Sequence, residues 1–215
     1  MSPKLFEAVG TDRMVTLDVH NLAAFQNAFR CQTEHLEATA LFVEHLATAH
    51  AEQELVVVSP DIGGVKRAAR LRDQLSGRLG RPVELAFTEK YRSRGVLSGR
   101  DQVLGPVRGR VAVVFDDLIS SGGTMARVAG SLHQLGAREI HLAATHALFS
   151  PAARAMLAAP EVASVIVTDS VAPRAEVTAG LDHPIVVLGL APLLAESIRR
   201  LHTGGSLSEL LALDR

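Results

Sequence analysis

Two adjacent acids followed by a run of small residues form the most specific chemical pattern in this chain. Asp116 and Asp117 come directly after the apolar run Val111–Phe115, and residues 120–124 read Ser-Ser-Gly-Gly-Thr. An apolar run of this length predicts a strand buried on both faces, which places the acids at its carboxyl end. The small residues then form the loop before a helical pattern over Met125–Leu135.

Such a loop is suited to phosphate. Backbone N–H groups and the dipole at the start of a helix attract an anion, and glycines let the backbone approach it closely. The neighbouring carboxylates accept hydrogen bonds from sugar hydroxyls or hold a metal ion. We therefore predict a phosphorylated-ribose site made by Asp116, Asp117, Ser120, Ser121, Gly122, Gly123 and Thr124. The alternative is an ordinary strand–turn–helix unit with solvated acids.

Reactive side chains also follow other strand-like runs. Asp18 and His20 are two residues apart, so on a strand their side chains share one face, and together they can hold a divalent ion. Asp61 lies in a Pro-Asp-Ile-Gly-Gly turn, where it either contacts a ligand or caps the next helix. His146 ends another strand, and a structural hydrogen-bonding role is favoured for it.

Basic residues open a segment without clean periodicity. Lys90 and Arg92 begin the stretch Tyr91–Pro106, which contains three glycines and is interpreted as a mobile loop that acts as a lid. A lysine and a guanidinium there can neutralise charge during diphosphoryl transfer, whereas the alternative is a solvated basic loop. The charges of Lys66–Arg78 are interpreted as solvated helix surface. The histidines in helical stretches, His45, His50 and His133, are interpreted as solvated or packing residues.

Strand-like and helix-like segments alternate along the chain, which predicts an α/β fold with a parallel sheet flanked by helices. The predicted strands are Met14–Val19, Glu54–Ser59, Val83–Thr88, Val111–Phe115, Glu139–Thr145, Ser164–Thr168 and Ile185–Leu190. The predicted helices are Leu36–Glu52, Val65–Leu79, Thr124–Leu135, Ala152–Leu157, Pro192–Leu201 and Ser206–Ala212. In such sheets ligands bind beyond the carboxyl ends of the strands, where the candidate residues gather.

Composition excludes several classes of function. The 215 residues carry a net charge of −1, which argues against a nucleic-acid or anionic-membrane surface. The single cysteine, Cys31, fits a reducing compartment, and no apolar run reaches the ~18 residues of a membrane span. We expect a cytoplasmic protein with a substantial core.

Five segments together resemble the ribose-phosphate pyrophosphokinase family, whose fold is that of the type I phosphoribosyltransferases. The first is the acid-and-loop segment, which is similar to the phosphoribosyl-diphosphate motif of that superfamily. The other four are Val-Thr-Leu-Asp-Val-His ending at His20, Ser-Pro-Asp-Ile-Gly-Gly at 59–64, Lys-Tyr-Arg-Ser-Arg at 90–94 and Ala-Thr-His-Ala-Leu-Phe-Ser at 144–150.

The resemblance implies transfer of the diphosphoryl group of ATP to the 1-hydroxyl of ribose 5-phosphate, which feeds nucleotide biosynthesis. It implies Lys90 and Arg92 as catalytic residues, residues 116–117 and 120–124 as the ribose 5-phosphate site, and His20 and Asp61 as ligands of Mg²⁺. It also implies a homo-oligomer, hexameric in the family. The alternatives are a phosphoribosyltransferase that uses 5-phosphoribosyl 1-diphosphate, and a non-catalytic paralogue that regulates a synthetase.

The chain departs from the family in three places. Only nineteen residues precede His20, whereas the family has a long segment there that helps to bind ATP. Ser120 stands where synthetases tend to have Asp, and Tyr91 replaces an arginine. We therefore expect one complete domain over residues 37–191, and a remnant of a similar domain over residues 1–36 on which residues 192–215 pack. We expect this chain alone to show little or no ATP-dependent synthesis.

Overall fold

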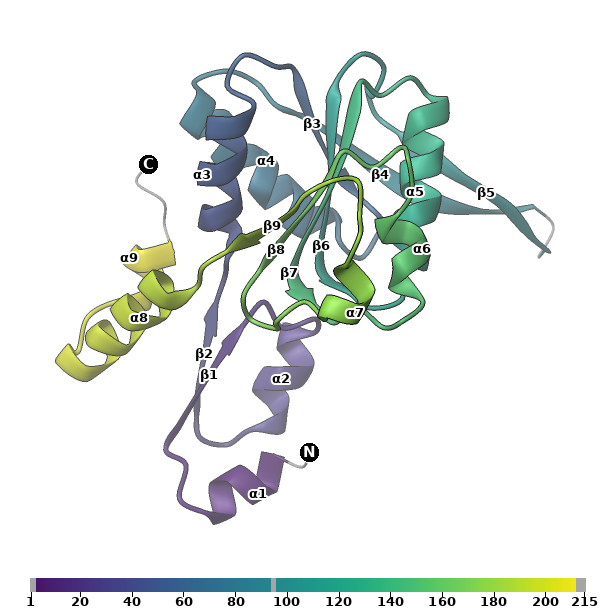
Figure 1. The fold of residues 1–215 in the computed structure, drawn as a ribbon. Helices are drawn as coiled ribbons and strands as arrows, with labels where there is room; N and C mark the ends of the chain where they lie inside the picture. The colour runs from purple at the N-terminus through teal and green to yellow at the C-terminus, as the bar shows by residue number, and fades with distance from the viewer. Residues whose placement is uncertain (1–2, 94–95, 212–215) are drawn as a thin grey trace. The chain divides into compact units, whose positions relative to one another are not determined.

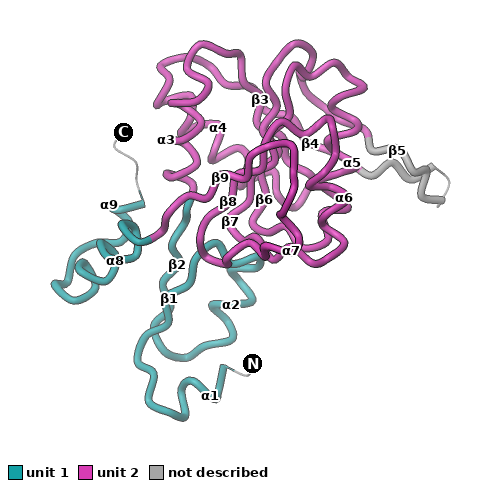
Figure 2. The backbone as a smooth tube through the Cα atoms, viewed as in Figure 1, with its two compact units in different colours: residues 1–38, 191–214 teal, residues 39–190, 215 magenta. Residues whose placement is uncertain are grey.

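The chain forms two compact units (Figure 2). The structure, a computed structural model, describes residues 3–93 and 96–211, with backbone only for 90–93 and 96–101. The larger unit is Thr39–Leu190, and the smaller one combines Met1–Ala38 with Ala191–Asp214. Among the described residues, no helix has the length and apolar character needed to cross a membrane. That the smaller unit is part of a second domain of the same type stays a prediction.

A seven-stranded sheet forms the centre of the larger unit, in the order β5-β4-β3-β6-β7-β8-β9 (Figure 1). Neighbouring strands are parallel except for the antiparallel pair β4–β5. The strands are β3 (Leu55–Ser59), β4 (Glu84–Ser93), β5 (Val96–Leu104), β6 (Val111–Ile119), β7 (Glu139–Ala147), β8 (Ser164–Thr168) and β9 (Ile185–Leu188). The predicted α/β class with a mostly parallel sheet is confirmed.

Helices cover both faces of this sheet (Figure 1). They are α3 (Thr39–Ala49), α4 (Val65–Leu79), α5 (Gly123–Gln134), α6 (Ala153–Leu157) and α7 (Ala175–Thr178). The chain leaves β3 through α4 toward β4 on one side, and leaves β6 through α5 toward β7 on the other. Because such crossovers are right-handed, α4 and α5 lie on opposite faces. The connections thus diverge between β3 and β6, the point at which open α/β sheets bind ligands.

The core explains why the apolar runs become strands. All five residues of β3 and of β8 are buried, as expected for strands covered by helices on both faces. The rings of Phe42 on α3 and Phe115 on β6 meet edge to face with centroids 5.1 Å apart. This packing fixes the part of β6 that directly precedes the two acids.

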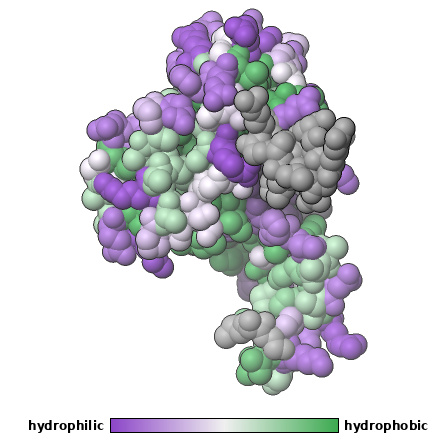
Figure 3. Space-filling model, turned by 90° about the vertical axis from the view of Figure 1, so that its right-hand side faces the viewer, coloured by the Kyte–Doolittle hydropathy of each residue, from purple (hydrophilic) through white to green (hydrophobic). Residues whose placement is uncertain are grey.

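The smaller unit contains a two-stranded parallel sheet and short helices. Its elements are α1 (Pro3–Ala8), β1 (Arg13–Leu17), α2 (Leu22–Ala28), β2 (Gln32–Leu36), α8 (Ala191–Thr203) and α9 (Leu207–Leu211). The predicted helix over Leu36–Glu52 begins only at Thr39, because Leu36 pairs with Leu17 across β1–β2. Hydrophobic and polar residues share the surface of this unit (Figure 3), and Leu5 and Val9 are 60% and 81% exposed.

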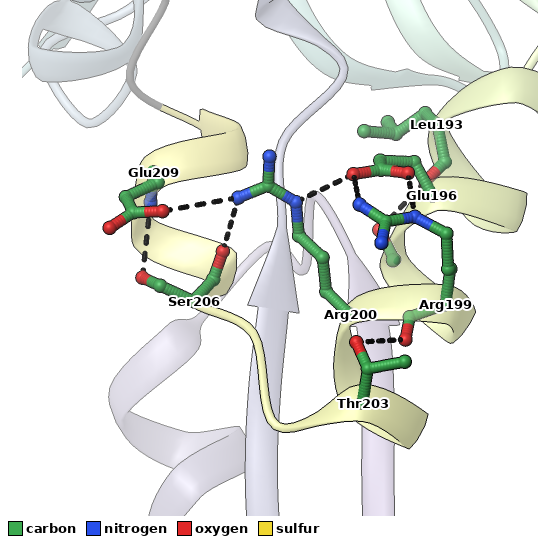
Figure 4. Close-up of polar contacts among 8 residues, drawn as sticks. Leu193, Glu196, Arg199, Arg200, Thr203, Ser206 and Glu209 are labelled. Carbon is green, nitrogen blue, oxygen red and sulfur yellow. Dashed lines mark hydrogen bonds and ion pairs between the residues drawn. The ribbon is translucent and has the colours of Figure 1, made fainter.

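Polar contacts connect the last two helices (Figure 4). Glu196 accepts hydrogen bonds from Arg199 and Arg200, which lower the pKa of its carboxyl group to about 2. Arg200 Nη1 also donates to the Ser206 carbonyl at 2.7 Å and lies 3.6 Å from a Glu209 oxygen. One guanidinium therefore contacts α8, the turn and α9 together.

Two predicted boundaries are wrong in ways that concern the site. The stretch Tyr91–Pro106 is expected to be a loop, but most of its described residues belong to β4 and β5, which pair antiparallel with Phe87 opposite Leu104 and Arg92 opposite Leu97. The strand predicted over Val111–Phe115 continues to Ile119, since residues 116, 118 and 119 still pair with β7. The acids therefore lie within the last part of a strand rather than beyond it.

Candidate functional site

The loop between β6 and α5 surrounds a small hollow. A cavity of about 190 Å³ is lined by Asp116, by residues 118–124 and by Met125. Ser120, Ser121 and Gly123 are exposed, while Gly122 is buried beneath them. Helix α5 starts at Gly123, so its first backbone N–H groups belong to this loop. Unbonded N–H groups at a helix start suit an anionic ligand.

Gly122 gives the loop its shape. Its φ is +74°, in the left-handed region, and it is the N-cap of α5. A Cβ built at this position would lie 2.8 Å from Cε and 2.9 Å from Cβ of Met156 on α6. Glycine is therefore required both for the backbone conformation and for the close approach of α6.

The segment after β7 forms two backbone hydrogen bonds with the end of β6 and the start of the loop. The backbone N–H of Phe149 donates to the Ile119 carbonyl at 3.1 Å, and that of Ser150 donates to the Ser120 carbonyl at 3.0 Å. Phe149 is fully buried and has a φ of +20°, which is unusual for a bulky residue. The Phe-Ser pair thus holds the carbonyls of the last strand residue and of the first loop residue.

Arg67 joins the two acids. Its Nη1 lies 2.5 Å from Asp116 Oδ1 and 3.3 Å from Asp117 Oδ1. Asp117 is 1% exposed, and its backbone N–H donates to Asp116 Oδ1 at 2.9 Å. Paired charges with several hydrogen bonds are the condition under which buried carboxylates are tolerated. The interpretation of all charges in Lys66–Arg78 as solvated surface is wrong for Arg67.

Asp116 has a raised pKa. Burial, together with the neighbouring Asp117, raises the pKa of the Asp116 carboxyl group to about 7, although the Arg67 charge acts in the opposite direction. A carboxyl group that changes charge near neutral pH at the mouth of a cavity is typical of a functional site.

Asp61 lies in the turn after β3, next to the acids in the sheet. Its Oδ1 accepts a hydrogen bond at 2.9 Å from the N–H of Gly64, the N-cap residue of α4, and this bond closes the turn before the helix. The side chain is nevertheless exposed. A Cβ at Gly64 would lie 2.8 Å from Ser59 Oγ and 3.6 Å from Arg67 Nη1, so this turn adjoins the Arg67 clamp.

Lys90 and Arg92 belong to β4, which is parallel to β3 with Ser59 opposite Phe87. Their side chains lie outside the described residues. The backbone places them beyond the point where β3 ends, on the same edge of the sheet as Asp61.

Asp18 and His20 belong to the smaller unit and are described within it. The expectation that they share a strand face is wrong, because β1 ends at Leu17 and Asp18 has a φ of +40°. Asp18 Oδ2 accepts from the Ala38 N–H at 3.0 Å, and its own N–H donates to the Leu36 carbonyl. His20 follows this turn and is exposed.

His146 lies within β7, opposite Leu118 of β6. Its Nδ1 is 2.9 Å from Ser170 Oγ, and Ser170 Oγ in turn donates to the Thr145 carbonyl at 3.0 Å. These contacts agree with the structural hydrogen-bonding role that the sequence favoured.

The left-handed backbone of Gly122 leads to a stability prediction. Gly122→Ala should lower the free energy of unfolding by about 1–3 kcal/mol, since alanine meets Met156 and resists a left-handed φ. Urea unfolding measures the change. Gly123→Ala is the matched control, because the nearest atom to a Cβ there is Ser121 Oγ at 3.8 Å, and it should change stability by less than about 0.5 kcal/mol. Equal losses in both variants would contradict the assignment.

The raised pKa of Asp116 predicts a pH-dependent effect on stability. Between about pH 4 and pH 7 the folded state keeps a proton that the unfolded state releases, so this group makes the wild type less stable as the pH rises through that window. Asp116→Asn cannot ionise, so its stability relative to wild type should improve by about 1–3 kcal/mol from pH 4 to pH 8. Urea unfolding across this range tests it, with the exposed Asp182→Asn as control; a flat difference for Asp116→Asn would refute the shift.

Comparison with known proteins identifies the family. The model of the phosphoribosyl synthetase-associated domain matches residues 98–212. A ribose-phosphate pyrophosphokinase of Rhodopirellula baltica is 38% identical over 96% of this chain and 63% of its own length. Ribose-phosphate pyrophosphokinase 2, chloroplastic, of Oryza sativa is 34% identical over 98% of this chain and 50% of its own length.

A solved structure agrees with these relatives. The phosphoribosylpyrophosphate synthetase of Mycobacterium smegmatis superposes with a TM-score of 0.79 at 34% identity, and the match covers 94% of this chain and 63% of that one. The chain thus spans between half and two thirds of the length of the relatives it matches. The family resemblance seen in the sequence is confirmed, and the chain belongs to the phosphoribosyl synthetase-associated domain family.

Proposed function

We propose that this chain carries the ribose 5-phosphate site of a ribose-phosphate diphosphokinase. In that reaction the 1-hydroxyl of the sugar attacks the β-phosphorus of ATP, and AMP leaves as 5-phosphoribosyl 1-diphosphate forms. The observation that carries the proposal is the cavity between β6 and α5, which is lined by Asp116 and by the residues at the start of the helix. The relatives named ribose-phosphate pyrophosphokinase support it.

The loop and the acids have different roles in binding the sugar phosphate. The backbone N–H groups and hydroxyls of residues 120–124 bind the 5-phosphate, since the helix dipole adds to their attraction for an anion. Asp116 accepts hydrogen bonds from the ribose hydroxyls, and Asp117 holds Arg67 in place beneath it. A ligand hydroxyl that donates to Asp116 favours its charged form, so sugar binding should release the proton that burial retains.

Asp61 and His20 are proposed to hold Mg²⁺. The exposed Asp61 carboxylate fits this role, because Mg²⁺ prefers oxygen ligands and keeps several waters. When bound, Mg²⁺ would offset negative charge on the triphosphate. The His20 assignment rests on the Asp-x-His resemblance, and its imidazole can act through a bound water.

Lys90 and Arg92 are proposed to act on the transferring group. Diphosphoryl transfer concentrates negative charge on oxygens in line with the broken bond, and a lysine and an arginine offset that charge. Support comes from their position on β4 at the ligand-binding edge of the sheet and from the resemblance of residues 90–94 to the family's catalytic segment.

Assembly and location are part of the same proposal. Exposed hydrophobic residues in the smaller unit, among them Leu5, Val9 and Val15, support a homo-oligomer, since apolar surface favours association. The family resemblance implies a hexamer. The single cysteine supports a cytoplasmic protein.

The sugar site is tested by binding. Asp116→Ala should weaken ribose 5-phosphate binding at least tenfold, because hydrogen bonds to a charged acceptor contribute about 1.5–3 kcal/mol each. Isothermal titration calorimetry on the 215-residue chain measures the affinity. Asp182→Ala removes an exposed carboxylate of the same unit and should bind as the wild type does. Wild-type affinity in Asp116→Ala would exclude Asp116 from the sugar site.

The catalytic role of Lys90 is tested by turnover. Lys90→Ala should reduce AMP release from ATP and ribose 5-phosphate by roughly 10²–10³-fold with the affinity for the sugar unchanged, since its charge acts mainly in the transition state. The assay uses a form of the protein that has the complete first domain of the family. Lys4→Ala, at an exposed lysine, serves as the control. Near-normal turnover in Lys90→Ala would rule the role out.

The same assay separates the alternative functions. Pyrophosphate release with a base, in place of AMP, would identify a phosphoribosyltransferase. Sugar binding without turnover under any of these conditions would identify a regulatory chain.

A further inference from the structure

A second cluster of ligand-type side chains lies at the opposite end of the sheet. Among the described residues, one nitrogen each from His50 and His141 and one carboxylate oxygen of Glu139 lie within 4.8 Å of one another. Glu139 and His141 are at the start of β7, and His50 follows the end of α3 (Figure 1). The candidate sugar site lies at the carboxyl ends of the strands, so this cluster is separate from it.

Each imidazole is held through its Nδ1. His50 Nδ1 is 2.5 Å from Gln53 Oε1, an acceptor, so His50 donates there and its Nε2 carries a free lone pair. His141 Nδ1 is 2.8 Å from Ser164 Oγ. A hydrogen bond on one ring nitrogen that orients the other is the usual arrangement for histidines that bind a metal ion.

One nitrogen of the cluster is buried and has no hydrogen-bond partner. His141 is 6% exposed, and its Nε2 is buried without a hydrogen-bond partner. Glu139 Oε2 lies 3.6 Å from it, within ion-pair distance but beyond hydrogen-bond range. His50 is 8% exposed, and its ring centroid lies 4.6 Å from that of His141. A buried polar atom left in this state costs free energy that a ligand would recover.

The chemistry of the three side chains selects the ion. The neutral form of an imidazole is the one that binds a metal ion. Two imidazoles and one carboxylate suit Zn²⁺, which takes this set with an open fourth position, and not Mg²⁺ or Ca²⁺, which prefer oxygen. The separation of 3.6 Å between His141 Nε2 and Glu139 Oε2 is near the ~3.3 Å that Zn–N and Zn–O bonds of about 2.0–2.1 Å imply.

We propose that His50, Glu139 and His141 bind one Zn²⁺ ion that joins the end of α3 to the start of β7. The ion holds two segments that are 89 and 91 residues apart in the sequence, so it stabilises the folded larger unit. Its remaining coordination position is open to water. The proposal goes beyond the diphosphokinase function and does not depend on it.

The test is Zn²⁺ binding by the untagged 215-residue chain. Calorimetry should show a site with one Zn²⁺ per chain, and excess Zn²⁺ should raise the thermal midpoint by several degrees, whereas Mg²⁺ at the same concentration should not. Co²⁺ in place of Zn²⁺ should give the visible absorption of a four-coordinate site with nitrogen ligands.

Variants locate the site. Glu139→Gln and His50→Gln should each weaken Zn²⁺ binding at least tenfold and abolish most of the thermal shift, while the exposed His133→Ala should leave both unchanged. Glu139 is 37% exposed at its side chain, so Glu139→Gln should fold normally, which circular dichroism verifies. The absence of a Zn²⁺-dependent thermal shift in the wild type, or wild-type affinity in Glu139→Gln, would overturn the proposal.

Discussion

The ion cluster of Arg67 with Asp116 and Asp117 is the interaction on which the candidate site depends. Two adjacent carboxylates at the end of a buried strand would repel each other in a setting of low dielectric. Arg67 offsets this repulsion from the first turn of α4, and it reaches the acids only because β3 and β6 are neighbours in the sheet. The helix that follows β3 therefore carries the positive charge that offsets the two acids of β6.

Strongly periodic segments were predictable, and long-range pairs were not. The strand Ser164–Thr168 and the helix Val65–Leu79 have the predicted bounds, because an apolar run and an amphipathic pattern are local properties. The role of Arg67 was missed, since in sequence it is one of several basic residues on a charged helix. Its place in the first turn after a Gly-Gly pair was the available clue, because side chains there face the ligand edge of the sheet. The first part of β4 was predicted, but its continuation and its pairing with β5 were not, because the sequence from Tyr91 onward lacks clean alternation.

The cluster of His50, Glu139 and His141 also could not be predicted from the sequence. His50 was interpreted as a solvated or packing residue because it follows a helical stretch, and nothing near it in sequence has ligand spacing. It becomes a candidate ligand only because the fold places it beside His141, which is 91 residues away in the sequence. Hydrogen bonds with Gln53 and Ser164 orient the two rings. Local patterns identify sites whose residues come from one loop, as residues 116–124 do. Sites assembled from separate elements require the fold.

The phosphate loop combines both kinds of information. Its residues are contiguous, so the sequence shows its chemistry, but its conformation is imposed by distant contacts. Met156 closes the space above Gly122, and the N–H groups of Phe149 and Ser150 bind the carbonyls of Ile119 and Ser120. A loop shaped before the ligand arrives loses little further conformational entropy on binding, which is how a few backbone N–H groups can bind a phosphate with useful affinity.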